Sequence, residues 1–326
     1  MATYNKIIDL IEKSKDIAVF MHANPDGDCL GSAIALTRFL NKKGKRVFCF
    51  APDLNKSALP VKVSFFGYEV ITDSYNGERF DLSIGVDLGS ANLMGDACFR
   101  IFLKGKKSIV IDHHSEHTDF ADVTVREKSA ASTTQILYKI LAEYDKSAID
   151  EKIAECLYTG LVTDSGGFSF SCTTSETHFV AGELLKYNID CAEINRIVMK
   201  DIPLNVFHLK NRVLSGMKLY EEGHIAVICF TKEDFEATGT NEKNTEGIIN
   251  SVLNVIGVEL AVSISETSDK CYKVSFRSKH NVDASACAKC FGGGGHFHAS
   301  GCRVYGYFED VYDKIISSCK EIYHYA

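Results

Sequence analysis

The chain has 326 residues, of which 45% are hydrophobic and 24% are charged. This length and composition favour a globular protein with two domains and well-buried cores. The formal net charge of -7 argues against a surface that holds long nucleic acid through many phosphates, because that mode of binding needs a basic stripe.

The 12 cysteines are scattered through apolar segments, which is typical of reduced thiols in a cytoplasmic protein and predicts no disulfide framework. The N-terminus has no long apolar stretch, and the apolar residues of segment 7–11 follow an amphipathic pattern. We therefore expect neither a signal peptide nor a membrane span, and we predict that the protein acts in the cytoplasm.

Residues 1–190 alternate between apolar runs typical of buried strands and helical patterns. This alternation predicts βαβ units, and hence an α/β domain with a parallel sheet and helices on both faces. The strands are expected near residues 17–21, 46–50, 82–86 and 108–111.

Possible metal ligands follow the first predicted strand. His22, Asp26 and Asp28 lie in a turn that contains Pro25 and Gly27. Because ligands of open α/β sheets bind at the carboxyl ends of the strands, these three side chains can converge there. Imidazole and carboxylate groups suit Mn²⁺ or a similar ion. The alternative is an acidic turn with an N-capping Asp and a surface His.

Residues of the same kind recur at three further places. A single one is more often a helix cap or the partner of a surface carboxylate. Four clusters at one edge of a parallel sheet are difficult to explain as independent caps, so together they predict a metal site, with a metal-free relative as the alternative. The further residues are Asp87 after the strand at 82–86, Asp112, His113 and His114 after the strand at 108–111, and Asp164 after the helical segment 153–158.

The second part of the chain has a different pattern. Residues 191–215 are expected to form a helical connector in which Pro203 separates two helices. Residues 216–326 are expected to form a smaller mixed-sheet α/β domain. Its expected strands lie near residues 225–231, 258–265, 272–277 and 302–308, the middle two as a hairpin-like pair, and its expected helices near 245–255, 283–291 and 311–323.

Four consecutive glycines, Gly292 to Gly295, precede His296. Ordering glycine costs more backbone entropy than ordering any other residue, so the run indicates a close approach of the backbone to a ligand. A flexible loop is the alternative. A second alternative is a structural zinc site, which we disfavour because its two cysteines fall in a helical run. Its ligands would be Cys287, Cys290, His296 and His298.

The motifs of the first part resemble those of the DHH phosphoesterase family, namely His22-x-x-x-Asp26-x-Asp28, Asp87, Asp112-His113-His114 and Asp164. The resemblance implies two divalent ions. Mn²⁺ is the expected ion, and Mg²⁺ or Co²⁺ are the alternatives. It implies one ion on His22, Asp26 and Asp87, and the other on Asp28, Asp87, His113 and Asp164. It also implies that Asp87 bridges the ions, that His114 faces the scissile phosphate, and that Asp112 orients His113. A shared carboxylate would offset the repulsion between two cations.

The second part resembles the DHH-associated domain through residues 245–250, 275–278 and 292–301. The whole chain is similar to the short two-domain members that act as oligoribonucleases and phosphoadenosine-phosphate (pAp) phosphatases. The resemblance implies an active-site cleft between the domains. It also implies a set of substrate-binding residues: Arg277, Ser278, Gly294, Gly295 and His296. His298 and Ser300 depart from the basic residue and alanine that relatives usually carry, which leaves the substrate preference open.

The function that the resemblance implies is hydrolysis of short RNA or DNA oligonucleotides and linear dinucleotides to mononucleotides, and of pAp to AMP, by in-line attack of a hydroxide that bridges the two ions. An enzyme similar to inorganic pyrophosphatase and a metal-free nucleotide sensor are the alternatives. Long nucleic acid and membranes are not expected as partners. The sequence leaves open a homodimer and the direction of degradation. His117 and His280 are expected to be surface residues.

Overall fold

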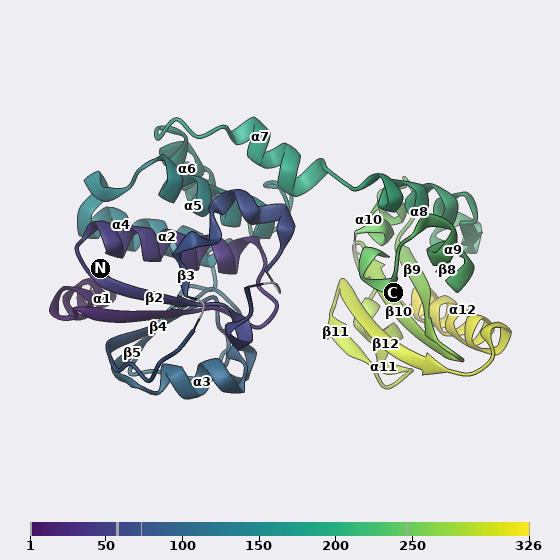
Figure 1. The fold of residues 1–326 in the computed structure, drawn as a ribbon. Helices are drawn as coiled ribbons and strands as arrows, with labels where there is room; N and C mark the ends of the chain where they lie inside the picture. Colours follow the sequence, from purple (N-terminus) through teal and green to yellow (C-terminus); the bar gives the residue numbers. More distant parts are fainter. Residues whose placement is uncertain (1, 57–58, 73, 246, 326) are drawn as a thin grey trace. The chain divides into compact units, whose positions relative to one another are not determined.

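A computed structural model describes residues 2–56, 59–72, 74–245 and 247–325. The chain divides into two compact units, unit 1 (Met1–Asp201) and unit 2 (Ile202–Ala326) (Figure 1). The boundary lies inside the segment predicted as a connector, so that α7 (Cys191–Asn195) belongs to unit 1 and α8 (Leu204–Ser215) to unit 2. Pro203 lies directly before α8. None of the described helices is both long enough and apolar enough to cross a membrane.

Unit 1 contains a six-stranded sheet in the order β3-β2-β1-β4-β5-β6, and its described strand pairs are all parallel. Phe20 at the end of β1 pairs with both Phe50 and Gly85, so the carboxyl ends of these neighbouring strands lie at one level. This arrangement confirms the predicted parallel α/β fold. The strands are β1 (Asp16–Phe20), β2 (Arg46–Phe50), β3 (Ile71–Thr72), β4 (Phe80–Val86), β5 (Gly105–Asp112) and β6 (Val123–Arg126).

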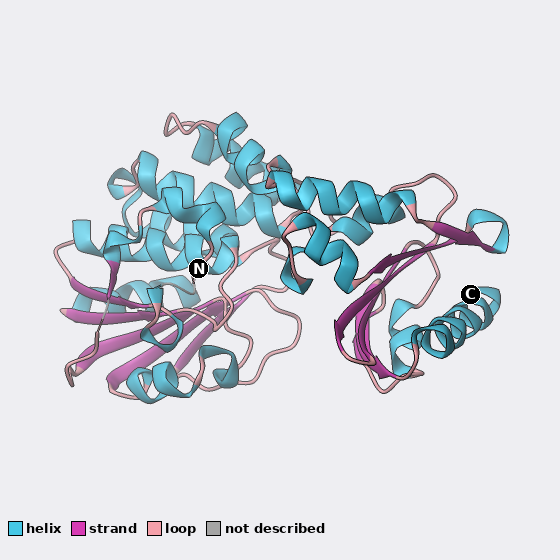
Figure 2. Cartoon of the chain, turned by 45° about the vertical axis from the view of Figure 1, so that its right-hand side comes forward, coloured by secondary structure: helices cyan, strands magenta, loops and turns pink. Residues whose placement is uncertain are grey.

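Helices cover both faces of this sheet (Figure 2). Successive residues of a strand point to opposite faces, and β1 shows the result. Ile17 and Val19 belong to the large core under the longer helices, whereas Ala18 and Phe20 belong to a smaller, aromatic core under α3. The helices on the first face are α1 (Ala2–Lys13), α2 (Gly27–Lys42), α4 (Thr133–Asp145), α5 (Glu151–Asp164) and α6 (Ser175–Leu185), and α3 (Asp96–Phe102) is on the second.

On the first face, α2 packs closely against α5 where the two helices cross. A Cβ atom added at Gly31 of α2 would overlap the main-chain carbonyl oxygen of Cys156 in α5. Because a backbone atom cannot turn away, the two helices would have to separate. We expect Gly31→Ala to lower the free energy of unfolding by about 1–3 kcal/mol, as measured by urea-induced unfolding.

Gly182 of α6 provides the matched control, because a Cβ atom added there meets no atom within 4 Å. Since alanine is the better helix former, Gly182→Ala is expected to raise the stability by up to about 1 kcal/mol. Equal stabilities of Gly31→Ala and the unchanged protein would contradict the close packing of α2 on α5.

Unit 2 contains the second sheet, in the order β11-β12-β10-β9-β8-β7. β8 and β9 pair in parallel, and the other described pairs are antiparallel, so the sheet is mixed as predicted. The predicted hairpin-like pair is β9 and β10, in which Val274 pairs with Ile264. The strands are β7 (Lys218–Tyr220), β8 (Ile225–Phe230), β9 (Leu260–Ser268), β10 (Cys271–Ser278), β11 (Gly294–His296) and β12 (Ala299–Tyr305).

Each face of this sheet has its own core. α8 packs on one face with α9 (Lys232–Thr238) and α10 (Ile248–Leu253). α11 (Ala284–Lys289) and α12 (Phe308–Tyr325) pack on the other. α10 is shorter than the helix predicted over 245–255, where Glu246 lies outside the described residues.

Candidate metal centre

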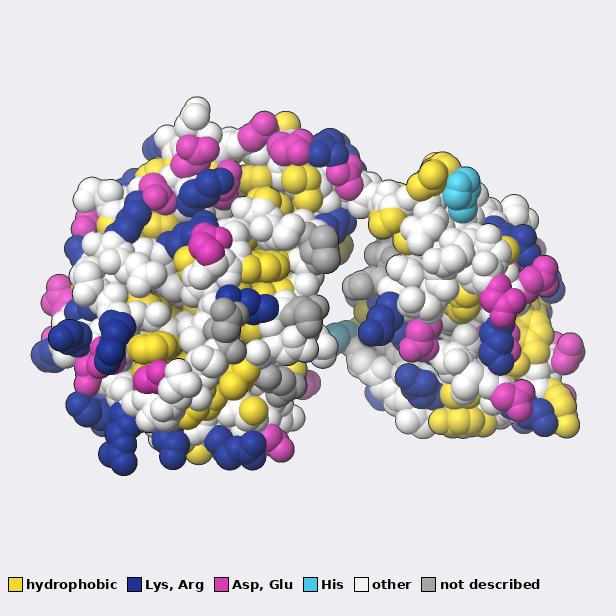
Figure 3. All heavy atoms as spheres, in the orientation of Figure 1, with side chains coloured by type: hydrophobic (Ala, Val, Ile, Leu, Met, Phe, Trp, Pro, Cys, Tyr) yellow, Lys and Arg dark blue, Asp and Glu magenta, His cyan; other side chains and the backbone are white. Residues whose placement is uncertain are grey.

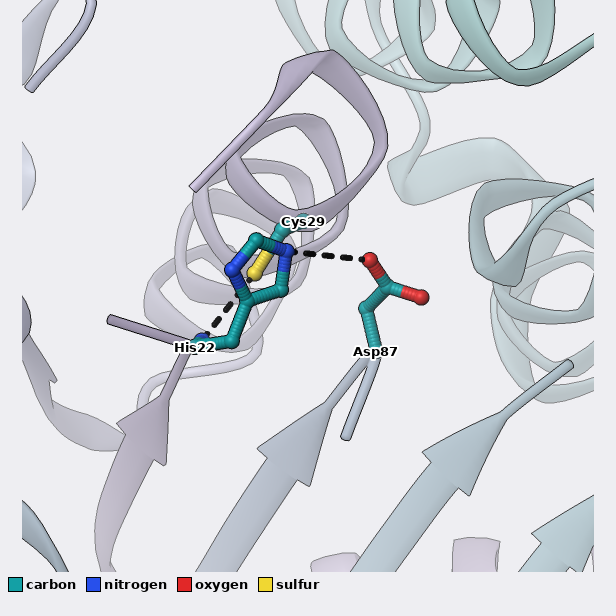
Figure 4. A group of neighbouring side chains, drawn as sticks. All are labelled: His22, Cys29 and Asp87. Carbon is teal, nitrogen blue, oxygen red and sulfur yellow. Dashed lines mark hydrogen bonds and ion pairs between the residues drawn. The ribbon is translucent and has the colours of Figure 1, made fainter. Parts of the chain in front are cut away.

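His22 and Asp87 meet at the carboxyl edge of the unit 1 sheet (Figure 4). His22 lies two residues beyond the end of β1 and Asp87 directly follows β4. The His22 Nε2 atom lies 3.5 Å from Asp87 Oδ2. Asp87 has a φ of 58°, a left-handed conformation that is uncommon outside glycine. Its own N–H donates to the carbonyl of Ile111 at 2.9 Å, which holds this turn against β5.

Asp87 lies at the centre of the histidines. Besides His22, the Nε2 atom of His113 and the Nδ1 atom of His114 each lie 3.6 Å from Asp87 Oδ1. The side chain of Asp87 is only 3% exposed, and the hydroxyl of Thr133 donates to Oδ1 at 2.9 Å. One buried carboxylate therefore faces three imidazoles with both of its oxygens.

A second group consists of Asp28, His113 and Asp164, whose potential ligand atoms all lie within 4.8 Å of one another. His113 Nε2 is 3.1 Å from Asp164 Oδ2. Asp164 is the last residue of α5, so the helix expected over 153–158 extends to this residue, and Asp164 ends a helix and not a strand of the sheet. The helix continues through Asp164 because its residues 157, 161 and 162 remain on the buried face.

Asp28 is fully buried near the start of α2. Its Oδ2 accepts from the main-chain N–H of Thr133 at 2.7 Å. Its Oδ1 accepts from the N–H of Thr134 at 2.9 Å and from the Thr134 hydroxyl at 2.7 Å. The carboxylate is therefore fixed by the beginning of α4. Neither threonine was predicted from the sequence, because a Ser-Thr-Thr run at the start of a helix indicates a cap and gives no sign of a distant partner.

Asp26 is the N-cap of α2, and its Oδ1 accepts from the N–H groups of Asp28 and Cys29, each at 3.0 Å. The alternative of a capping aspartate is thus correct for this residue. The same Oδ1 lies 3.9 Å from His22 Nε2, and the side chain is 57% exposed, but Asp26 belongs to none of the potential ligand groups of the described residues. Cys29, which the sequence analysis missed, accepts the His22 N–H at 3.3 Å through Sγ and forms a potential ligand group with His22 and Asp87.

The crowding of these groups changes their pKa values. Burial, and then the charges of Asp164 and Asp87, raises the pKa of Asp28. Burial also raises the pKa of Asp164, against the hydrogen bond from His113. Burial disfavours the charged form of His113, but the hydrogen bond to Asp164 and the nearby carboxylates raise its pKa overall. Carboxylates forced together in this way fit divalent cations, which relieve their mutual repulsion.

Asp112 was expected to orient His113, but its carboxylate contacts two other imidazoles instead. Asp112 Oδ1 lies 2.7 Å from His114 Nδ1, and Oδ2 lies 3.0 Å from His117 Nδ1. The expectation that His117 is a surface residue was also wrong, because its side chain is 3% exposed and its ring stacks on Phe120. His280 is exposed, as expected.

The residues expected to bind substrate lie on β10 and β11 of unit 2. The Arg277 side chain donates to the carbonyl of Phe276 at 2.9 Å. The Ser278 hydroxyl lies 3.2 Å from His298 Nδ1, and Ser300 is buried and donates to the carbonyl of Ala284. His298 and Ser300 thus have contacts within unit 2.

Part of the glycine run has a structural reason that the sequence analysis did not identify. β11 pairs with β12, Gly294 opposite Gly301 and His296 opposite Ala299. A Cβ atom at Gly293 or Gly295 would overlap main-chain atoms of the paired strand, whereas one at Gly294 would meet nothing within 4 Å. Tight pairing therefore accounts for Gly293 and Gly295 without a ligand.

The alternative zinc site is not formed among the described residues. Cys287 is buried in the core of unit 2, whereas Cys290 is exposed. Within the described part of the chain, the groups that could hold a metal ion all lie in unit 1.

Two domain families match this chain. Residues 16–161 match the N-terminal domain of the DHH family, and residues 223–324 match the DHHA1 domain. Together with the parallel sheet and the aspartate–histidine cluster at its edge, these matches show that the chain belongs to the DHH phosphoesterase family.

Known relatives match over nearly the whole chain. The bifunctional oligoribonuclease and PAP phosphatase NrnA of Bacillus subtilis is 29% identical over 323 residues, which cover 97% of this chain and 98% of that protein. The protein of the same name from Thermus thermophilus is 28% identical, over 94% of this chain and 89% of its own. The crystal structure of an exopolyphosphatase-related protein from Bacteroides fragilis superposes with a TM-score of 0.86 at 27% identity, covering 98% of this chain and 96% of that one.

Proposed function

We propose that this protein is a Mn²⁺-dependent cytoplasmic phosphoesterase that hydrolyses short oligonucleotides and linear dinucleotides to mononucleotides and converts pAp to AMP. The observation that carries the proposal is the cluster of buried carboxylates and imidazoles around Asp87, at the sheet edge where such folds bind ligands. The full-length relatives named oligoribonuclease and PAP phosphatase support the choice of substrates.

Six residues would hold two divalent ions, and Asp87 would contact both. His22, Asp26 and Asp87 would hold one, and Asp28, Asp87, His113 and Asp164 the other. Bound there, the ions would neutralise charge on the phosphate and lower the pKa of a water molecule, so that it can attack at neutral pH. The imidazole and carboxylate donors of this site suit such ions.

His114 would act on the substrate. Because a carboxylate can only accept hydrogen bonds, His114 would carry a proton on Nδ1, the atom that lies 2.7 Å from Asp112 Oδ1. The ring is 45% exposed, and its Nε2 atom is then the atom that can exchange a proton or a hydrogen bond with a phosphate oxygen. Asp112 would fix this orientation from the buried side.

Unit 2 would hold the remainder of the substrate. Arg277 suits this role because its planar guanidinium can bind two phosphate oxygens at once. Ser278 and His296 would add donors, and so would the main-chain N–H groups of Gly294 and Gly295.

The proposed enzyme should prefer short substrates. With a net charge of -7 and both signs of charge on the visible face of each unit (Figure 3), it offers a long polyanion little beyond local contacts. We expect Arg277→Ala to lower kcat/KM for a dinucleotide by about 10- to 100-fold, the cost of one charge-assisted hydrogen-bonded contact, and to affect longer oligomers less.

The test is a panel of end-labelled oligomers of graded length, with pAp and pyrophosphate, read by product identity with Mn²⁺ and with Mg²⁺. Arg303→Ala, which removes the same charge from β12, is the control and should keep the preference for short substrates. Equal turnover of a long strand and a dinucleotide would argue against length selection. If pyrophosphate were the only substrate hydrolysed, the proposed function would be wrong and the protein would be a pyrophosphatase.

A further inference from the structure

His117 is a buried histidine that the proposed reaction does not yet use. It lies in the loop after β5, three residues beyond His114, and its side chain is 3% exposed. Its ring packs on Phe120 with a centroid separation of 6.3 Å and an interplanar angle of 24°. A histidine placed in this way holds one orientation, because the stacked neighbour limits rotation of the ring.

In this orientation the His117 ring contacts Asp112. The carboxylate of Asp112 is fully buried, and it has one imidazole on each oxygen, His114 at 2.7 Å and His117 at 3.0 Å. Since the carboxylate only accepts, both contacting Nδ1 atoms carry protons. His117 therefore occupies the oxygen that His114 does not use.

The backbone that carries His114 is held as well. The guanidinium of Arg126 donates to the carbonyl of His114 at 2.8 Å, and also to that of Ser115. The N–H of Thr118 donates to the carbonyl of Gly89 at 2.8 Å. With the loop fixed at His114 and on its C-terminal side, the remaining freedom of the His114 ring depends on the orientation of the Asp112 carboxylate.

We propose that His117 is a positioning residue for His114, which acts by holding the Asp112 carboxylate so that His114 keeps its proton on Nδ1 and presents Nε2 to the substrate. This inference rests on the proposed role of His114 and adds to it a His117–Asp112–His114 chain. Without the His117 N–H, Asp112 can turn either oxygen toward His114, and the ring loses its single orientation.

The first test compares two substitutions. His117→Phe keeps an aromatic ring beside Phe120 but removes the donor, and it should lower kcat by about 10- to 100-fold, as the loss of comparable supporting hydrogen bonds does, with KM and metal content unchanged. His117→Asn retains an N–H donor and should restore kcat to within a few-fold. His324→Phe is the control, since it makes the same substitution at a histidine of α12 whose side chain is 63% exposed, and it should leave the rate unchanged.

A second measurement separates positioning from a general structural role. In an Asp112→Asn background, His117→Phe should have almost no further effect, because its effect passes through Asp112. If the rate losses of Asp112→Asn and His117→Phe multiplied in the double variant, the proposal would be overturned. A His117→Asn variant as slow as His117→Phe would also overturn it.

A third measurement needs neither substrate nor turnover. Nitrogen NMR of the Mg²⁺-loaded protein should show His114 as the Nδ1–H form in the unchanged chain and as a mixture of forms in His117→Phe. The same form in both would overturn the proposal even if the enzyme is active. The Nδ1–H form would remain in the unchanged chain even if the proposed substrates are wrong.

Discussion

Asp87→Ala is expected to remove at least one bound ion and to lower kcat/KM by about 1,000-fold or more, the scale found when a group that stabilises transition-state charge is lost. The reason is geometric, because Asp87 lies 3.5 to 3.6 Å from three imidazoles through both of its oxygens. Without this carboxylate two cations would repel each other with no shared ligand between them.

The measurement is metal content by elemental analysis together with turnover. Because Asp87 has a left-handed backbone conformation that alanine adopts poorly, Asp87→Asn is the necessary companion, since asparagine tolerates this conformation and nearly keeps the side-chain volume. Two retained ions with near-normal rates in the Asn variant would refute a bridging role.

His113→Ala and His114→Ala are expected to lose activity for different reasons. His113 Nε2 lies between Asp164, at 3.1 Å, and Asp87, at 3.6 Å, so its loss should lower metal content and hence activity. His114 has its Nδ1 on Asp112, so His114→Ala should keep both ions and lower kcat by about 100- to 10,000-fold, the usual contribution of general acid–base catalysis.

The comparison is informative because the two rings lie close together. Their centroids are 4.8 Å apart, and Asp87, His113 and His114 form one of the potential ligand groups, so the two side chains do not diverge as neighbours at a strand end generally do. The division of roles rests instead on the contact of His114 with Asp112. Equal loss of metal from both variants would make His114 a ligand.

The sequence predicted the strands that carry the site better than it predicted the edges of the sheet. The strands expected at 17–21 and 46–50 are β1 (Asp16–Phe20) and β2 (Arg46–Phe50), because short, nearly continuous apolar runs are typical of buried parallel strands. β3 and β6 were not predicted. β3 has two residues and β6 has four, too few for a periodic pattern.

The same distinction holds within the site. His22 and Asp87 could be found because a ligand-type residue after a buried strand lies at a known edge of the sheet. The partners of Asp28 lie 105 and 106 positions away in the chain, and no local pattern records such a contact. His117 was missed because it lies in a loop, where no periodic pattern indicates its stacking on Phe120 or its contact with the Asp112 carboxylate.

The hydrogen bonds of Asp28 have a practical consequence for anyone who wants an inactive form of this protein. Removing that carboxylate would leave the first N–H groups of α4 buried without an acceptor, at a cost of about 1–3 kcal/mol for each group, so the inactive chain would also be poorly folded and readily degraded in a cell. His114 is half exposed and supports no helix. A His114 variant is therefore the better bait for identifying the substrates of this protein in living cells.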